Sequence, residues 1–401
     1  MDLLMSATDG GRLTLSLLDA SDFAGFRDPW NALLDESSCQ SFFLKWEWLY
    51  TCWRAAEREN AELLVVLCYD GPDLVGIAPL YAYATSAMKL PVTKVAFLGD
   101  RVAGDYMDVI SRPGYEERCC RRVLQFLRED AAVRFDMVEI DAVCSDSQLF
   151  HFAGCEAAER RDLSVDFRFE CPRAMLGSTY AEYVAGLTSS TRYAIGRRER
   201  RFVRRLRAVD VVNLDLCQHI DLLDVLFELH ASRWETARPG ESTFHSDFRK
   251  RFNRELLGRL ESGDGYFSLV RADGRPVSIV YVFAYKKHAF FYQSGWSPEF
   301  ASHGVGLIGV QEAIRHAANA GYASFDFLRG EEDYKYKFAG DVRRAYAIRM
   351  FGRGPRGRVL ERLFKVKGGL KSRLAALRRT SRPAARSGVR GRSTEAVESW
   401  S

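Results

Sequence analysis

Two closely spaced glycines lie just before a predicted helix in the C-terminal half of the sequence. The helix is predicted from Leu307 to Ala320, where apolar residues recur at helical spacing. The first backbone N–H groups of a helix have no partner within the helix, and the helix dipole places partial positive charge at the same end. Glycines let a bulky anion approach these groups closely. The pattern therefore predicts a phosphate or pyrophosphate site at His303, Gly304, Val305, Gly306 and Leu307.

A surface loop without a ligand is the alternative interpretation, and a comparison within the chain favours the anion site. A related segment in the N-terminal half has Pro113-Gly114 at the corresponding turn, followed by Glu116 and Glu117. Proline removes an N–H donor there, and two carboxylates in the first helical turn repel a phosphate. We therefore expect only the C-terminal loop to bind a nucleotide-type ligand.

The two loops belong to longer segments that resemble each other. Each is preceded by a predicted hairpin, with one turn at Asp70-Gly71 and the other at Asp273-Gly274. After each hairpin come a strand, a glycine-containing loop, an amphipathic helix and another strand. These elements are predicted at 94–98, 115–130 and 137–143 in the first copy and at 289–295, 307–320 and 323–328 in the second. The order predicts two tandem α/β units, with a chance resemblance of two hairpins as the alternative.

The chain divides into three predicted regions. We expect a first unit at residues 1–180, a second at 181–352, and a basic helix with a disordered tail at 353–401. Residues 188–207 form a predicted helix with eight arginines, too many for a buried element. An amphipathic helix is predicted at 219–234.

Several short motifs, spread over residues 30 to 350, together resemble one known family. In the second copy they are FYQSGWSPEF at 291–300, Gly306-Leu307, FDFLRG at 325–330 and YKYK at 334–337. Upstream they are Ser41-Phe42, Trp46, Trp48, residues 76–80, Leu98-Gly99, Arg192 and Arg233-Trp234. The combination resembles the CelD-type acetyltransferase-like family associated with bacterial cellulose and exopolysaccharide synthesis. That family is a branch of the GNAT superfamily and is related to the Fem transferases.

The resemblance implies a fold and a donor. The fold is a pair of tandem GNAT-like units, each a mixed, mostly antiparallel sheet flanked by helices, with the N-terminal unit degenerate and on the acceptor side. The implied co-substrate is an acyl-CoA, with acetyl-CoA favoured. Its pyrophosphate is expected at residues 303–307, and its pantetheine arm between strands that end near Gly295 and start near Ala323. The sequence departs from the GNAT loop pattern at Ala301, where glutamine or arginine is usual.

Acyl transfer also needs a base for the acceptor and an acid for the departing thiolate. Asp326 and Glu331, or Glu332 beside it, are the candidate bases, and Tyr334 is the candidate acid. Asp326 bonding only to Arg329 or to a backbone turn is the alternative, as is simple packing of Tyr334. The residues expected to contact the acceptor are Gln293, Ser294, Arg233, Trp234, Arg329 and Lys335. A solvated basic face is the alternative for Arg329 and Lys335.

Positive charge is concentrated near the C-terminus, where residues 353–401 carry 14 lysines and arginines against 3 glutamates. Residues 359–379 have an apolar and a basic face, which favours weak association with the inner membrane. The arginine-rich helix at 188–207 fits a solvated surface, an anionic membrane or the guidance of a phosphate ligand. Neither segment has the interleaved exposed aromatic residues that stack on bases, so binding of nucleic acid other than tRNA is not expected.

The sequence thus predicts a cytoplasmic acyltransferase that acts on an amine, hydroxyl or saccharide acceptor. Its N-terminus has no signal-peptide pattern, and no apolar run approaches the roughly 20 residues of a membrane span. The nine cysteines show no metal or disulfide spacing, and the seven histidines form no cluster, so no metal is expected. Two alternatives stay open: a Fem-like transferase that uses aminoacyl-tRNA, and a non-catalytic component of a polysaccharide synthesis complex.

Overall fold

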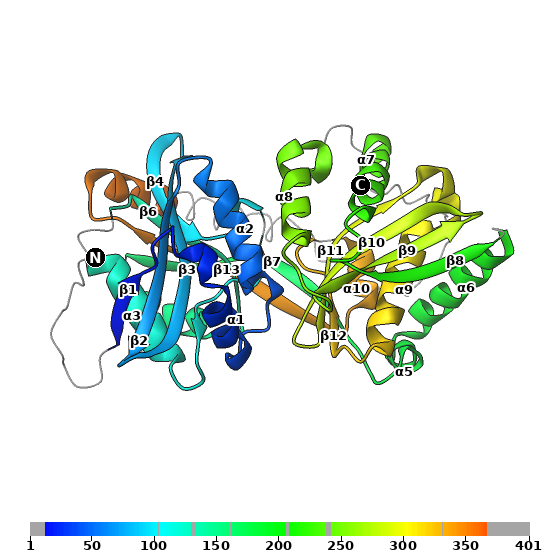
Figure 1. Cartoon of the computed structure of the whole chain (residues 1–401), viewed down its shortest axis with the longest axis horizontal. Helices are drawn as coiled ribbons and strands as arrows, with labels where there is room; N and C mark the ends of the chain where they lie inside the picture. The colour runs from blue at the N-terminus through cyan, green and yellow to red at the C-terminus, as the bar shows by residue number, and fades with distance from the viewer. Residues whose placement is uncertain are drawn as a thin grey trace, which may run out of the picture.

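The computed structural model of the chain describes residues 13–102, 104–129, 134–159, 162–205, 208–237, 242–330 and 332–366. They fold into two halves that share one sheet (Figure 1). The first half contains β1 (Thr14–Leu17), α1 (Arg27–Glu36), α2 (Trp46–Glu57), β2 (Glu62–Asp70), β3 (Asp73–Ala87), β4 (Leu90–Phe97), β5 (Ile110–Ser111), α3 (Glu116–Glu129), β6 (Met137–Cys144), α4 (Gln148–Glu159) and β7 (Leu163–Met175). The second contains β8 (Val209–Asp215), α7 (Leu222–Ala237), α8 (Asp247–Leu257), β9 (Gly265–Ala272), β10 (Arg275–Tyr285), β11 (His288–Trp296), α9 (Val305–Asn319), β12 (Ser324–Asp326), α10 (Asp333–Phe338) and β13 (Asp341–Phe351). Two helices, α5 (Tyr180–Gly186) and α6 (Ser189–Arg205), connect the halves.

The element order confirms the duplication and extends it. Both predicted hairpins are present, as β2–β3 and β9–β10, and each is followed by the predicted strand, helix and strand. Each half also begins with an edge strand and two helices, and ends with a further helix and strand. Of these elements the sequence patterns revealed only α7, as the amphipathic helix predicted at 219–234. Apart from β5, the two halves therefore repeat the same series of elements.

The last strand of each half pairs with the other half. The sheet order is β1-β2-β3-β4-β6-β13-β7-β12-β11-β10-β9-β8, with β5 beside β3. In this order β13 lies against β6 of the first half, and β7 lies against β12 of the second. The two strands also pair with each other along most of their length. The boundary predicted at residue 180 stays a prediction, since the exchanged strands make the sheet continuous.

Each half contains one parallel strand pair within an otherwise antiparallel arrangement. In the second half, β11 and β12 pair in parallel from His288 and Ser324 to Phe290 and Asp326. Strand β12 ends there, whereas β11 continues to Trp296. The two strands therefore separate, and the edge of β11 that faces away from β10 is open to a ligand beyond Phe290.

The apolar core continues from one half into the other. Phe42 stacks on Phe283 with ring centroids 4.2 Å apart, and Trp48 contacts Phe252 at 5.2 Å. Helices α2 and α8 meet at the centre of the molecule (Figure 1). This packing holds the halves as one unit, so a site in one half has a fixed relation to the surface of the other.

Two basic segments take helical form, as predicted. The arginine-rich segment forms α6, and residues 355–366 form a helix after β13. The expected disordered tail after residue 366 lies outside the described residues. Among the helices that are described, none combines the length and the apolar character needed to cross a membrane.

Candidate functional site

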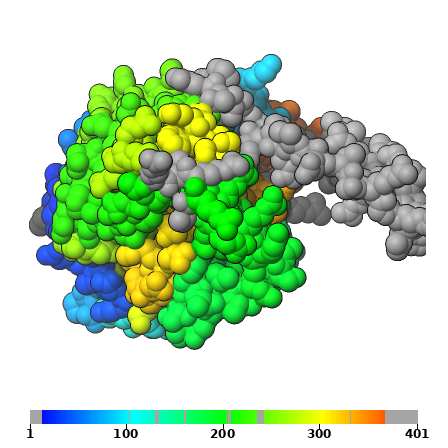
Figure 2. Space-filling model, turned by 90° about the vertical axis from the view of Figure 1, so that its right-hand side faces the viewer, coloured from blue at the N-terminus to red at the C-terminus, as the bar shows by residue number. Residues whose placement is uncertain are grey.

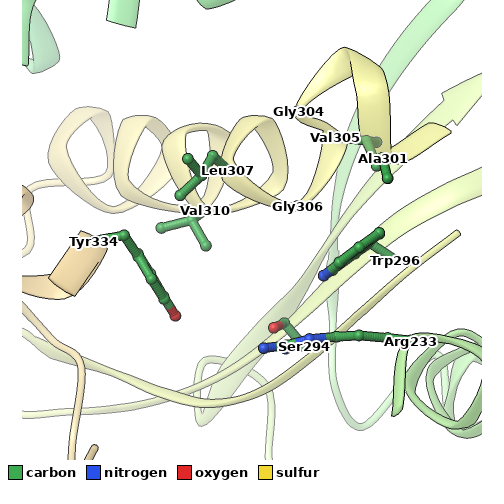
Figure 3. Close-up of a pocket in the computed structure, with 10 residues that line it drawn as sticks. All are labelled: Arg233, Ser294, Trp296, Ala301, Gly304, Val305, Gly306, Leu307, Val310 and Tyr334. Carbon is green, nitrogen blue, oxygen red and sulfur yellow. The ribbon is translucent and has the colours of Figure 1, made fainter. Parts of the chain in front are cut away.

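A cavity lies where β11 separates from β12 (Figure 3). Helix α9 forms one wall, β11 the opposite wall, and α10 closes one end. The residues that line it are Arg233, Ser294, Trp296, Ala301, Gly304, Val305, Gly306, Leu307, Val310 and Tyr334. Four of the five residues of the predicted anion site are among them. His303, the fifth, is half-buried with its ring beside Ser302 Oγ, and it does not line the cavity.

The beginning of α9 leaves its backbone donors directed to the cavity. Gly304 is the N-cap residue and has a φ of 69°, in the left-handed region that glycine adopts most easily. No side chain caps this end, and its first turn contains no acidic residue. The N–H groups of Val305, Gly306 and Leu307 are the donors that a helix cannot satisfy itself. An anion in the cavity would meet both these donors and the positive end of the helix dipole.

The corresponding helix of the first half is closed by its own carboxylate. Glu116 and Glu117 lie in the first turn of α3, and the Glu116 Oε2 atom accepts a hydrogen bond of 2.7 Å from the N–H of Gly114. The carboxylate already occupies the position at which a phosphate would bind. The difference that the sequence predicted between the two loops is therefore present in the structure.

Two glycines allow the cavity walls to pack closely. A Cβ atom on Gly306 would lie 2.8 Å from Cδ1 of Trp296, and one on Gly295 would lie 2.5 Å from the backbone nitrogen of His230. Gly306 thus lets Trp296 lie against the first turn of α9, and Gly295 lets α7 lie on β11. The sequence predicted that Gly306 lets a ligand approach the backbone closely. The structure adds a second reason why this residue is glycine, because a larger residue would clash with Trp296.

A bulge in β11 changes the direction of its side chains beside the cavity. Gln293 pairs with Tyr281 and Phe291 pairs with Val282, so Tyr292 is an extra residue in β11. The corresponding pair β3–β4 has no such shift in register. After the bulge, Ser294 and Trp296 face the cavity, while Gly295 faces α7. Alternation along this strand is the signal that could have added Trp296 to the predicted site.

Arg198 of α6 approaches the glycine loop from outside, a position that the sequence patterns did not single out. Its Cγ and Cδ atoms lie 3.5 Å from where a Cβ atom of Gly304 would be, and its guanidinium donates to Oε1 of Gln311 in α9. Burial lowers the pKa of Arg198, but the group stays charged at neutral pH. Helices α6 and α9 lie side by side on this surface, α6 in green and α9 in yellow-orange in Figure 2. Arg198 thus brings positive charge to the loop that has Ala301 in place of the usual polar residue.

Tyr334 is the predicted acid that the structure brings to the cavity. It projects from α10 toward the space between α9 and β11 (Figure 3). Burial, and next the Glu332 carboxylate, raise the pKa of the Tyr334 hydroxyl above its ordinary range, against the opposing effect of Arg233. The hydroxyl is therefore protonated at neutral pH and can donate to an anion that develops beside it.

Arg233 lines the cavity, whereas Trp234 and Gln293 lie behind its wall. The indole N–H of Trp234 donates to Nε2 of His230 over 3.1 Å. Because an indole nitrogen only donates, His230 carries its proton on Nδ1, which lies 2.8 Å from Ser242 Oγ. Burial lowers the pKa of His230 to about 4, partly offset by a hydrogen bond with Gln293. His230, Trp234 and Gln293 therefore form an uncharged, hydrogen-bonded group between β11 and α7.

Asp326 lies outside the cavity, between the two halves. Its carboxylate accepts hydrogen bonds of 2.9 Å from the Tyr106 hydroxyl and of 2.8 Å from the N–H of Leu328, and the residue is 1% exposed. The neighbouring Phe325 and Phe327 pack toward α9, so alternation turns Asp326 to the opposite face. The backbone-turn bond that the sequence left open as the alternative for this residue is thus present. The catalytic role of Asp326 stays a prediction that this geometry does not favour.

Replacement of Asp326 by asparagine is expected to change how stability depends on pH. Burial raises the pKa of Asp326 to about 6 from an ordinary value of 3.8. The protonated carboxyl therefore contributes fully to the free energy of unfolding below pH 4, and this contribution is lost as pH rises to about 6. The free energy of unfolding falls by about 3 kcal/mol over this range, and Asp326→Asn abolishes this pH-dependent fall. Chemical denaturation of both proteins between pH 4 and 7 measures it; parallel curves over that range would contradict the assignment.

Two other predicted site residues, Arg329 and Lys335, do not line the cavity. Arg329 donates through Nε to Asp105 over 2.7 Å and its guanidinium lies 4.6 Å from the Phe169 ring, at the contact between the halves. Lys335 is 3% exposed, and its Nζ atom donates to the carbonyl of Arg329 over 2.8 Å. Buried Lys335 is not part of a solvated face. Glu331 lies outside the described residues.

A metal site does not emerge from the described part of the chain, where no group of three or more His, Cys, Asp or Glu side chains is placed to hold an ion. The chemistry available at the cavity is instead that of backbone N–H groups, one arginine in the wall and a second beside the loop, a serine and a protonated tyrosine. These groups can bind a phosphorylated ligand at one end and donate a proton at the other.

One region of the chain is similar to a known family. Residues 189–336, which include α6, the cavity and Tyr334, match the family described as an acetyltransferase (GNAT) domain. No match was found among curated proteins. The specific resemblance to CelD-type proteins is not tested by this match, which is to the broader GNAT domain.

Solved structures share the fold of most of the chain at low sequence identity. FemX has a TM-score of 0.61 at 12% identity, covering 86% of this chain and 99% of that one. A conserved protein of unknown function from Bacteroides thetaiotaomicron has a TM-score of 0.51 at 12% identity, covering 84% and 99%. L-PGS from Bacillus licheniformis has a TM-score of 0.50 at 11% identity, covering 89% and 99%. The predicted tandem GNAT-like fold is therefore confirmed.

Proposed function

We propose that this chain transfers an acyl group from an acyl-CoA to an amine or hydroxyl acceptor, with the donor bound in the cavity between α9 and β11. The observation that carries the proposal is the difference between the two helix beginnings. The start of α9 is uncapped and opens into the cavity, whereas the start of α3 is closed by Glu116. Of the two helix beginnings, the one in the second half thus combines free backbone donors with an open strand edge.

The residues of the cavity fit the parts of such a donor in order. The pyrophosphate meets the N–H groups of Val305, Gly306 and Leu307, with Arg198 supplying the nearby positive charge. The amide groups of the pantetheine arm bind along the open edge of β11, whose ladder with β12 ends at Phe290. This places the thioester end of the donor toward Ser294 and Tyr334.

The chemical step then follows from the groups near that end. The acceptor nitrogen or oxygen attacks the thioester carbonyl carbon, the carbon–sulfur bond breaks, and the thiolate takes a proton from Tyr334. The acceptor loses its own proton to a carboxylate, directly or through water. We assign this step to Glu332, two residues before Tyr334, whose side chain is 40% exposed and forms an ion pair of 3.0 Å with Lys335. Glu331, its neighbour in the sequence, is the alternative.

The acceptor is proposed to approach from the contact between the two halves, where Arg329 and Phe169 lie. The resemblance to CelD-type proteins supports a saccharide acceptor and a role in exopolysaccharide or cellulose synthesis. Acetyl-CoA is the donor that the same resemblance favours.

The test is a thermal-shift titration with acetyl-CoA, longer acyl-CoAs and free CoA. A ligand that binds only the folded state stabilises it by about 2.7 kcal/mol at a hundredfold excess over Kd. We expect saturable stabilisation, and we expect Arg198→Gln to weaken binding about tenfold because it removes one charge-assisted contact. Arg201→Gln, an exposed position on the same helix, is the matched control. No shift with any acyl-CoA would favour a non-catalytic component.

Aminoacyl-tRNA is the second candidate donor, because the exposed face of α6 carries arginines that could bind the phosphates of tRNA. Arg197, Arg200, Arg201 and Arg204 are exposed on the helix that lies beside the cavity. Deacylated tRNA is the probe in the same titration. Stabilisation that falls steeply with salt and is lost when these four arginines are changed to glutamine would support tRNA over an acyl-CoA.

A further inference from the structure

A second functional surface lies on the first half, away from the cavity. The helix at 355–366, orange in Figure 1, lies beside β4 at the end of the molecule opposite the second half. Leu360 is fully buried in a cluster with Val92 and Met137, and Phe364 packs on the same cluster. Ala87 and Leu90, at the tip of the β3–β4 hairpin, also contact it. The helix and the hairpin tip are thus held together as one surface.

The outward side of this surface exposes apolar side chains. Val359 is 46% exposed and Val366 is 70% exposed. They are seven residues apart and so lie on one side of the helix, next to the face that contains Leu360. Met88, at the hairpin tip, is 36% exposed. These three side chains have no role in the cluster below, so their exposure is not explained by the packing of the first half.

Basic side chains surround these apolar positions. We define the basic end face as Met88, Lys89, Arg358, Val359, Arg362 and Val366, all of which are exposed. The acidic residue of the helix, Glu361, is paired with Lys365. The chain after residue 366 carries nine further lysines and arginines against two glutamates. In the sequence, the excess of basic over acidic residues therefore extends beyond this face.

We infer that the basic end face binds the surface of an anionic lipid bilayer. Lysine and arginine attract anionic headgroups, and apolar side chains on the same face enter the boundary between headgroups and acyl chains. A nucleic acid or another hydrophilic polyanion would use the arginines but leave Val359, Val366 and Met88 exposed. The mixture of basic and apolar side chains thus favours lipid. This inference is independent of the proposed acyl transfer, because it involves no residue of the cavity.

Flotation of the full-length protein with vesicles tests the inference. The probes are vesicles of phosphatidylcholine alone and vesicles containing about one third phosphatidylglycerol. We expect binding only to the second kind. The triple variant Lys89→Gln, Arg358→Gln, Arg362→Gln should partition about 100-fold more weakly, since each basic residue near such a surface contributes about fivefold. The pair Met88→Asn, Val366→Asn should reduce the binding that remains at moderate salt.

Matched variants elsewhere on the chain give the control. Arg197→Gln, Arg200→Gln and Arg204→Gln remove the same charge from the exposed face of α6, and Met175→Asn replaces a side chain that is 47% exposed on β7. We expect these proteins to bind vesicles like the unchanged chain. Equal loss in the two triple variants would mean that net charge alone attracts the protein, and unchanged binding of the end-face variant would overturn the inference. Loss confined to the α6 variant would place the anion site there instead.

Discussion

Tyr334→Phe is expected to slow acyl transfer by about 1000-fold while leaving the affinity for acyl-CoA nearly unchanged. The ring packs against Phe327 in the wall of the apolar cluster beside α9, with centroids 6.3 Å apart, and phenylalanine keeps this contact. Only the hydroxyl directed to the cavity is lost, and with it the proton for the departing thiolate. Chromatographic measurement of CoA release avoids thiol reagents, which would also react with the cysteines of the chain.

A tyrosine two residues away provides the control for this prediction. Tyr336→Phe changes the same helix at a side chain that is 38% exposed and does not line the cavity. We expect it to keep its rate. If Tyr334→Phe instead weakened the binding of acyl-CoA and left turnover intact, Tyr334 would be part of the donor's binding surface rather than its proton donor.

Gly306→Asp is expected to weaken acyl-CoA binding by about 1000-fold. The new carboxylate lies in the first turn of α9, where it repels a pyrophosphate and competes for the same backbone donors. Its Cβ atom also displaces Trp296, which would lie 2.8 Å away. The substitution thus reproduces in the second half what Glu116 does in the first. Isothermal titration or thermal shift with CoA measures the effect.

The matched control places the same substitution on a helix of the first half. A Cβ atom on Gly154 of α4 has no atom within 4 Å, so Gly154→Asp adds a charge without a clash. We expect that protein to bind CoA normally. The melting temperature of Gly306→Asp without ligand shows whether the fold survives the contact with Trp296. Retained CoA binding in a folded Gly306→Asp protein would falsify the assignment of the loop.

Local sequence signals predicted most of what lies along the chain around the site. Asp-Gly pairs gave both hairpin turns, and helical spacing gave α3, α6 and α9. The sequence also showed that α3 begins with acidic residues and α9 with glycines. The structure explains how the two helix beginnings differ, because Glu116 accepts a hydrogen bond from the N–H of Gly114. These features depend on residues within one turn or one strand, so the sequence alone was enough to determine them.

Contacts between distant segments decided the rest. The exchange of β7 and β13 joins residues that lie far apart in the sequence, as in the pair Asp326 and Arg173 or the pair Arg349 and Glu139. Local patterns do not specify such pairings, because alternation sets the face of a strand but not its neighbour. The same holds for Arg198, which reaches Gly304 only because α6 lies beside α9. Asp326 points to Tyr106 and away from the cavity because the two halves pack together. The sequence therefore determined the elements and their ends, while tertiary packing decided which side chains meet at the site.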